Sequence, residues 1–275
     1  MNFTVNFSST YGLPKYDIAF AISVVTLLLV PPLNIYTLLL IVRGGVETIK
    51  SDFYRLNLAV SEILMCFYCL FYILYVLQDI SVLILGVMFF VNFLHVSRHL
   101  FLGCICVECY LAVVHPVIFL RYKLLRYKIM CCSVVWFITL AFCVFYTSYG
   151  SYALIITHNA LLGFYTVVFS LMLFCCVSVL WALKQPGPGD GRRVEGYGAK
   201  RRAFNIIMTT TVITVMNYLP MVPLFLLSNY ISPQVEDAAL AIVHCCGLLP
   251  PLHYLQRVRK LFPSNFLITM KCTTH

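Results

Sequence analysis

Seven continuous apolar stretches constrain the fold of this chain more than any other feature. They cover residues 18–42, 56–76, 82–108, 129–149, 160–183, 203–227 and 238–255. Each is close to the roughly 20 residues that an α-helix needs to cross about 30 Å of hydrocarbon. They do not alternate between apolar and polar residues, as the strands of a membrane β-barrel do. The sequence therefore predicts an all-α membrane protein, a seven-transmembrane helix bundle followed by a short membrane-surface helix.

The composition agrees with this fold, because 61% of the residues are hydrophobic and only 11% are charged. A water-soluble domain of this size would lack the polar residues to cover its surface. We expect three parts: an extracellular tail over residues 1–16, the seven-helix domain over residues 17–256, and a cytoplasmic surface helix and tail over residues 257–275.

Lysine and arginine are distributed unevenly between the loops. If the first stretch begins outside the cell, 17 of the 19 Lys and Arg residues fall on the inner side. The positive-inside rule then predicts a multi-pass plasma-membrane protein with an extracellular N-terminus. The formal charge of +9 follows from this topology and favours contact with anionic membrane lipid rather than nucleic acid. Asn2 and Asn6 begin two glycosylation sequons on the predicted extracellular side.

The third apolar stretch ends in Glu108-Cys109-Tyr110, and a basic loop follows over residues 121–128. This pattern resembles the cytoplasmic end of the third helix of rhodopsin-like (class A) G-protein-coupled receptors. In that family an acidic residue and a tyrosine flank an arginine, and Cys109 stands at the arginine position.

The resemblance extends over residues 16–262, since further matches follow in the family's order. They are Asn34; Leu56 to Glu62, similar to Leu-Asn-Leu-Ala-x-x-Asp; Trp136; Asn217 to Pro220, similar to Cys-Trp-x-Pro; and Pro250 to Tyr254, similar to Asn-Pro-x-x-Tyr. The resemblance implies a G-protein-facing switch at Glu108, Cys109, Tyr110 and Tyr254.

Prolines within the apolar stretches predict irregular helix geometry. A proline inside a membrane helix frees a carbonyl one turn back and kinks the axis. We therefore expect hinges at Pro220 and Pro251. The adjacent pairs Pro31-Pro32 and Pro250-Pro251 predict stronger breaks, because two neighbouring residues lack N–H donors.

Three departures from the family pattern bear on function. Cys109 replaces the switch arginine, Pro250 replaces an asparagine, and no cysteine in the predicted outer loops can form the family's usual outer disulfide. These departures predict weakened or atypical G-protein coupling.

Two charged residues lie within predicted membrane spans, Glu62 in the second and Arg98 in the third. A lone charge at the centre of a bilayer costs about 2.5–3.5 kcal/mol on insertion scales, so such residues face the interior of a bundle. By the family's helix arrangement, both line the small cavity that often holds a sodium ion. We hypothesise that Arg98 replaces the ion and pairs with Glu62, with help from Asn34. The alternative is a protonated Glu62, with Arg98 bonded to a carbonyl group or water.

The family's outer pocket predicts where a ligand binds. Val91 stands where amine receptors carry an aspartate, so a cationic amine ligand is disfavoured. The expected lining is mostly apolar and aromatic, which suits a neutral or lipid-like small molecule. It comprises Val91, Asn92, His95, Tyr218, Phe225, Leu240 and His244.

Three functions remain open. The first is a receptor for an unknown non-amine small molecule or lipid-like ligand, with a heterotrimeric G protein, membrane lipid and a second receptor copy as candidate partners. The second is a non-signalling decoy or partner subunit. The third, a small transporter or channel, would need a polar pathway or repeated halves that the sequence lacks. No pattern of catalytic residues, metal ligands or cofactor-binding residues is present, so an enzyme is not expected.

Overall fold

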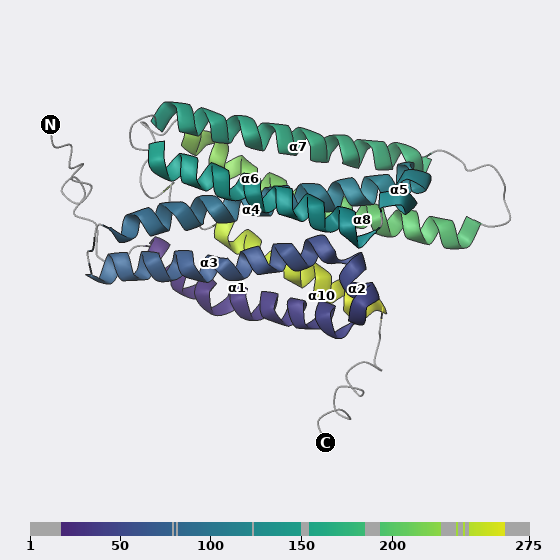
Figure 1. Cartoon of the computed structure of the whole chain (residues 1–275), viewed down its shortest axis with the longest axis horizontal. Coiled ribbons are helices and arrows are strands. Elements are labelled where there is room, and N and C mark those ends of the chain that lie inside the picture. The colour runs from purple at the N-terminus through teal and green to yellow at the C-terminus, as the bar shows by residue number, and fades with distance from the viewer. Residues whose placement is uncertain are drawn as a thin grey trace, which may run out of the picture.

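The computed structural model describes residues 18–78, 80, 82–122, 124–149, 154–184, 193–226, 235, 239 and 242–261. Within these ranges the regular structure is entirely helical, without a β-strand. Figure 1 shows long, roughly parallel helices packed side by side. The predicted sequons at Asn2 and Asn6 and the predicted ligand residue Leu240 lie outside the described residues.

Six long helices form most of the structure. They are α1 (Ile18–Arg43), α3 (Phe53–Gln78), α4 (Leu83–Val114), α6 (Leu125–Tyr149), α7 (Leu154–Lys184) and α8 (Arg193–Leu226). Shorter elements are α2 (Gly45–Ser51), α5 (Pro116–Tyr122), the 3-10 helix η1 (Cys246–Leu248) and α10 (Leu249–Leu261). Among the described residues, α1, α3, α4, α6 and α7 contain segments that are long and apolar enough to span a membrane. The chain is therefore a helical protein of membrane type.

The helices extend beyond the apolar stretches, mainly at one end of the bundle. Helix α4 continues six residues past Glu108 to Val114, and α8 begins ten residues before Ala203 at Arg193. Figure 1 shows that α2, α5 and the end of α10 lie together at this end. It is the end to which the sequence assigned the basic loops. Backbone hydrogen bonds continue a helix past the apolar region, so hydropathy alone underestimates its length.

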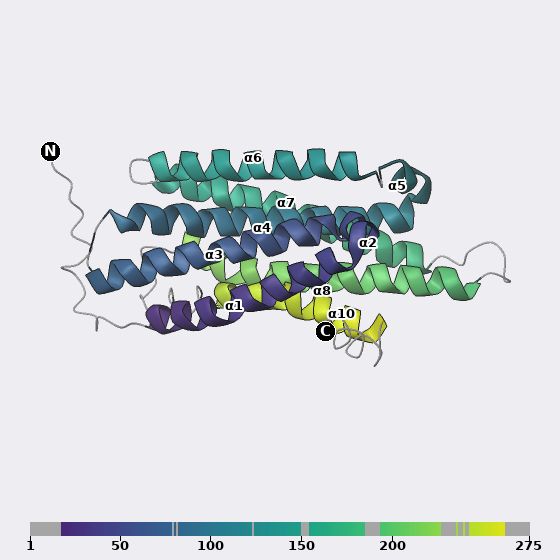
Figure 2. The same cartoon turned by 60° about the horizontal axis from the view of Figure 1, so that its bottom comes forward.

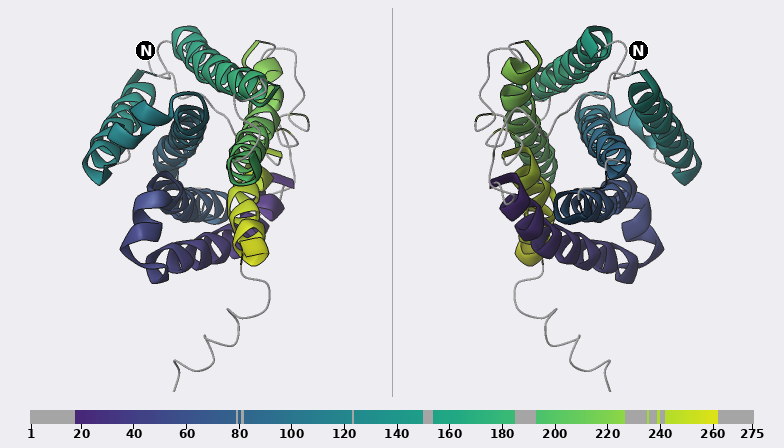
Figure 3. Two further views of the ribbon diagram at one scale, coloured as in Figure 1. Left: turned by 90° about the vertical axis from the view of Figure 1, so that its right-hand side faces the viewer. Right: turned by 90° about the vertical axis from the view of Figure 1, so that its left-hand side faces the viewer.

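Helix α4 occupies the centre of the bundle. It packs against α3, α6, α7 and α8, while α1 packs against α3. The arrangement can be followed from two sides in Figures 2 and 3. Consecutive residues of α4 from Asn92 to His99 are buried, so this helix is surrounded by neighbours rather than packed through one face. A polar side chain on α4 must therefore find its partners within the protein.

The last predicted span differs from the single helix expected over residues 238–255. Its described part contains η1 followed by α10, which continues without a break through Gln256 to Leu261. Pro250 and Pro251 lie in the first turn of α10, where backbone N–H groups have no acceptor within the helix. The α-helix is interrupted by η1 directly before this pair, in line with the predicted break, whereas no break separates a span from a surface helix at residues 256–257.

Pro31, Pro32 and Pro220 lie within continuous helices. Helix α1 continues through Pro31 and Pro32, so the predicted break there is wrong. Losing two N–H donors frees two carbonyl groups, but the hydrogen-bond ladder continues on both sides of the pair. Pro220 lies inside the continuous helix α8.

Candidate functional site

A buried ion pair lies at the centre of the bundle. The guanidinium group of Arg98 on α4 donates from Nε to Oε1 of Glu62 on α3 at 2.5 Å, and from Nη2 to Oε2 at 2.8 Å. Both side chains are 0% exposed. Two parallel hydrogen bonds to both carboxylate oxygens match the strongest geometry of an arginine–carboxylate pair. The predicted pairing is confirmed, and this geometry favours it over a protonated Glu62.

Arg98 also contacts the last third of the chain. Its Nη1 atom donates to Oδ1 of Asn217 on α8 at 3.1 Å and to the backbone carbonyl oxygen of Val243 at 2.9 Å. Four hydrogen bonds compensate the buried charge, as a buried guanidinium requires. One side chain thus connects α3, α4, α8 and the segment before η1. Asn217 was recognised in the sequence only as part of a motif.

Asn34 does not assist the pair. Its Nδ2 atom donates to the carbonyl oxygen of Val30, one turn back in α1, at 2.9 Å. Among the described residues it makes no hydrogen bond with Glu62 or Arg98. The predicted contribution of Asn34 is therefore wrong, because Asn217 and Val243 supply the additional acceptors.

Gly247, in η1, is a site residue that the sequence reasoning missed. A Cβ atom at this position would lie 2.9 Å from both Nη2 of Arg98 and Oε2 of Glu62. Only a residue without a side chain allows the backbone to approach the ion pair this closely. An isolated glycine within an apolar stretch was the available signal, but its partner is far away in the sequence.

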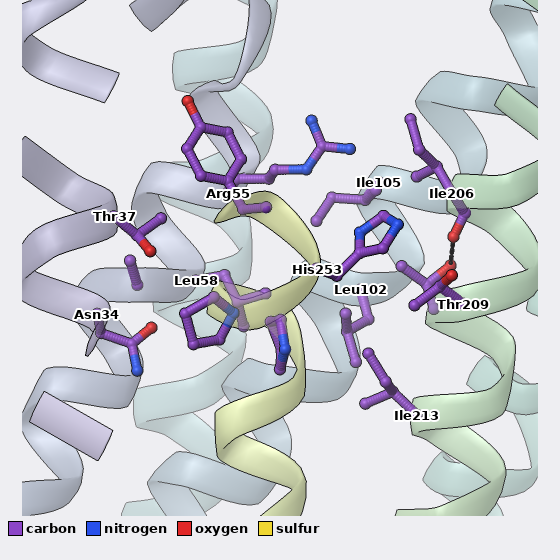
Figure 4. A pocket seen from close by; sticks show the side chains of 15 residues that line it. Asn34, Thr37, Arg55, Leu58, Leu102, Ile105, Ile206, Thr209, Ile213 and His253 are labelled. Atoms are coloured by element: carbon purple, nitrogen blue, oxygen red, sulfur yellow. Dashed lines mark hydrogen bonds between the residues drawn. The ribbon is translucent and has the colours of Figure 1, made fainter. Parts of the chain in front are cut away.

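A small cavity lies between α1, α3, α4, α8 and α10. Figure 4 shows its lining, with Asn34 and Thr37 on one side of α10 and Ile206, Thr209 and Ile213 on the other. The cavity brings together Asn34, Pro250, Pro251 and Tyr254, all singled out from the sequence. Its volume of about 30 Å³ suits one water molecule. It is too small for an organic ligand.

The ion pair predicts insensitivity to sodium. Because the guanidinium group bonds both oxygens of Glu62, a sodium ion would have to displace a bidentate partner. We expect the thermal unfolding temperature of the purified protein to be the same in sodium chloride and in choline chloride at equal ionic strength. If sodium raises the unfolding temperature and Glu62→Gln abolishes that rise, then Arg98 does not take the place of a sodium ion beside Glu62.

A second polar group lies where α4, α6 and α2 meet. Lys128 on α6 donates to Glu108 on α4 and to the carbonyl oxygens of Lys50, at 2.7 Å, and Ser51, at 3.3 Å. Glu108 therefore has a cationic partner even though the neighbouring position holds Cys109. Cys109 is half-buried against the main apolar core.

The aromatic residues of the predicted switch lie apart from this ion pair. The hydroxyl group of Tyr110 is 3.2 Å from Nε2 of His115. Tyr254 is buried beside Leu40 and Ile41 of α1. The four predicted switch residues thus occupy the same end of the bundle but do not form one hydrogen-bonded group in the described structure.

Three of the predicted ligand residues have partners within the bundle. Nδ2 of Asn92 donates to the carbonyl oxygen of Met88 at 2.7 Å. The hydroxyl group of Tyr218 is 3.0 Å from Oγ1 of Thr166 on α7, and the ring of His244 stacks on that of Tyr68 at 5.1 Å between centroids.

The other predicted ligand residues differ in how far their side chains are buried. His95 is buried and Val91 is half-buried, while the side chain of Phe225 lies outside the described structure. None of the predicted ligand residues whose side chains the structure describes lines the small cavity or the larger cavity considered below. The outer ligand pocket therefore stays a prediction.

No protein-family model matches this chain, and no curated protein sequence matches it.

Proposed function

We propose that the chain is a seven-helix receptor of the rhodopsin-like type in the plasma membrane, with an extracellular N-terminus. The six long helices and the helical stretch over residues 242–261 support this architecture. Two residues that carry the resemblance also contact each other: Nε1 of Trp136 on α6 donates to Oδ1 of Asn57 on α3 at 3.0 Å. Residues matched independently along the sequence are thus neighbours in space, as a common fold requires.

The observation that supports the receptor proposal best is the buried Arg98–Glu62 pair. It joins α3 to α4, and through Asn217 and Val243 it joins both to the last third of the chain. The pair lies where the resemblance places the central polar cavity of the receptor family, so it supports the seven-helix receptor arrangement. Breaking a buried ion pair costs about 3–5 kcal/mol, so this network favours a single arrangement strongly.

We infer weakened coupling to a heterotrimeric G protein from the Glu108 end of α4. Cys109 supplies no cationic side chain, and Glu108 is bonded to Lys128, whose ammonium group is buried. The end of the helix thus lacks an exposed arginine at the position where the resembling receptors place one. For the ligand, the absence of an acidic residue at Val91 supports a neutral or lipid-like molecule rather than an amine.

Restoring the missing arginine tests this proposal. We expect Cys109→Arg to raise basal G-protein activation above that of the native chain, because it places a guanidinium group at the end of α4. The measurement is nucleotide exchange on a panel of purified G proteins, with receptor and variant reconstituted at equal amounts in nanodiscs.

Cys109→Gln is the matched control, because glutamine is long and polar but carries no charge. Activation by the arginine variant alone supports a receptor silenced at this position. Equal rates of nucleotide exchange with the native chain and both variants would contradict the claim that Cys109 weakens coupling. A complete lack of exchange in all three would favour the non-signalling decoy or partner-subunit function.

A further inference from the structure

A second cavity, of about 270 Å³, lies between α4, α6 and α7. It shares no lining residue with the small cavity near the central ion pair. Leu100, Gly103 and Leu111 of α4 form one wall, and Val168 and Leu171 of α7 form another. At roughly 30 Å³ for a group of a water molecule's size, the cavity holds about nine such groups. It is therefore large enough for part of an organic ligand.

The sparse contact between α6 and α7, which both line the cavity, points to an opening between these two helices. Helix α4 packs closely against both, whereas α6 and α7 have little contact with each other. Figure 3, viewed along the bundle, shows α6 and α7 spread apart beside α4. The neighbouring side chains are apolar and exposed, including Val134 on α6 at 56%, and Val167 at 69% and Leu171 at 44% on α7. In a membrane such a surface faces hydrocarbon, so a ligand reaches this cavity from the lipid phase.

One end of the cavity is polar, because Glu108 and Lys128 line it. The ammonium group of Lys128 already has three acceptors: Glu108 and the carbonyl oxygens of Lys50 and Ser51. It has no further N–H to offer, since a lysine has three. Glu108 accepts from Lys128 through Oε1, and no described residue donates to Oε2. The polar end therefore offers a hydrogen-bond acceptor.

The charges at this end also select the ligand. The charge of Glu108 is balanced by Lys128, so the site has no unpaired cation for a carboxylate or phosphate. An anionic head group would be repelled by Glu108 and would find no free donor on Lys128. A hydroxyl group would donate to Glu108 without disturbing the ion pair.

We propose that this cavity binds a neutral single-chain lipid with a hydroxyl-bearing head group, of the monoacylglycerol type. The head donates to Glu108, the first part of the chain fills the apolar space beside Gly103, and the rest of the chain extends into the bilayer between α6 and α7. This site is separate from the predicted outer pocket. It does not depend on G-protein coupling, so failure of the coupling proposal leaves it intact.

Photo-crosslinking in phosphatidylcholine nanodiscs tests the site. The probe is a monooleoylglycerol that carries a diazirine on its acyl chain, and peptide mass spectrometry locates the adducts. We expect adducts on cavity-lining segments of α4, α6 and α7, and their loss when unlabelled monooleoylglycerol is added in excess. The same diazirine chain presented as a free fatty acid should label these segments less.

Leu171→Trp fills the opening of the cavity and should reduce these adducts to the level of ordinary exposed helix faces. Leu173→Trp is the matched control, because Leu173 lies two residues from Leu171 and so points away from it on α7, is exposed and does not line the cavity. It should leave labelling unchanged. Leu111→Trp repeats the test from the opposite wall should the first variant be recovered unfolded.

Three further outcomes test the head group and the site. In Glu108→Gln the charge of Lys128 is no longer balanced, so the preference for the neutral probe over the fatty acid should fall or reverse. If the probe labels all exposed helix faces equally, and Leu171→Trp does not change this labelling, the proposed site is wrong. Equal labelling by the neutral and anionic probes in the native protein would overturn the head-group assignment.

Discussion

Glu62→Gln should destabilise the folded protein by about 3–5 kcal/mol, the usual cost of removing one partner from a buried ion pair. Glutamine keeps the shape of the side chain but leaves the fully buried guanidinium group of Arg98 without a compensating charge. Its amide NH₂ group would also face an N–H donor of Arg98 where a carboxylate oxygen now accepts. The measurement is the free energy of unfolding in mixed micelles, followed by helical circular dichroism.

The double variant Glu62→Leu with Arg98→Met separates charge from packing. It replaces both ions by apolar side chains of similar volume, a change that is often neutral or stabilising in buried pairs. We expect it to recover most of the stability that Glu62→Gln loses. If Glu62→Gln costs less than about 1 kcal/mol, the expected net value of an ordinary hydrogen bond, then the two side chains do not form a buried ion pair.

Gly247→Ala should destabilise the protein by about 1–3 kcal/mol, the usual cost of overpacking a buried site. The added methyl group would lie 2.9 Å from Nη2 of Arg98 and from Oε2 of Glu62. The ends of long side chains normally move aside at little cost. Here the guanidinium group is held by Glu62, Asn217 and the carbonyl oxygen of Val243, so any displacement weakens several hydrogen bonds. Unfolding in mixed micelles again provides the measurement.

Gly163→Ala is the matched control on α7. Nothing lies within 4 Å of the position that its Cβ atom would take, and alanine is favoured over glycine in a helix by about 1 kcal/mol. This variant should therefore stabilise the protein. In the Glu62→Leu, Arg98→Met background, the cost of Gly247→Ala should fall, because the atoms that the methyl group approaches are gone. An unchanged cost there would show that the clash does not involve the ion pair.

The sequence predicted the helical class and the positions of the six long helices from local information. A continuous apolar stretch of about 20 residues identifies a helix wherever it packs. The same reasoning placed Glu62 and Arg98 in the interior, since intramembrane charges avoid lipid. Local reasoning failed at Pro31-Pro32, because a helix tolerates missing N–H donors when the hydrogen-bond ladder continues on both sides of them.

The sequence did not predict the hydrogen-bond partners of the buried charged residues. Arg98 was expected to gain help from Asn34, but its acceptors besides Glu62 are Asn217 and Val243, 119 and 145 residues away in the chain. Lys128 was assigned only to a basic loop, yet it is buried against Glu108. Neither contact has a local signature, because hydropathy and motif spacing report on residues near one another in the sequence.

The sequence by itself thus determined that this is a helical membrane-type protein with a charged residue in each of two spans. Only the tertiary structure decided which groups compensate those charges, which residues lie against the ion pair, and where α4, α6 and α7 enclose a cavity. The physical reason is that an apolar stretch forms a helix through its own backbone hydrogen bonds. A buried charge or a cavity instead depends on side chains that distant helices bring together.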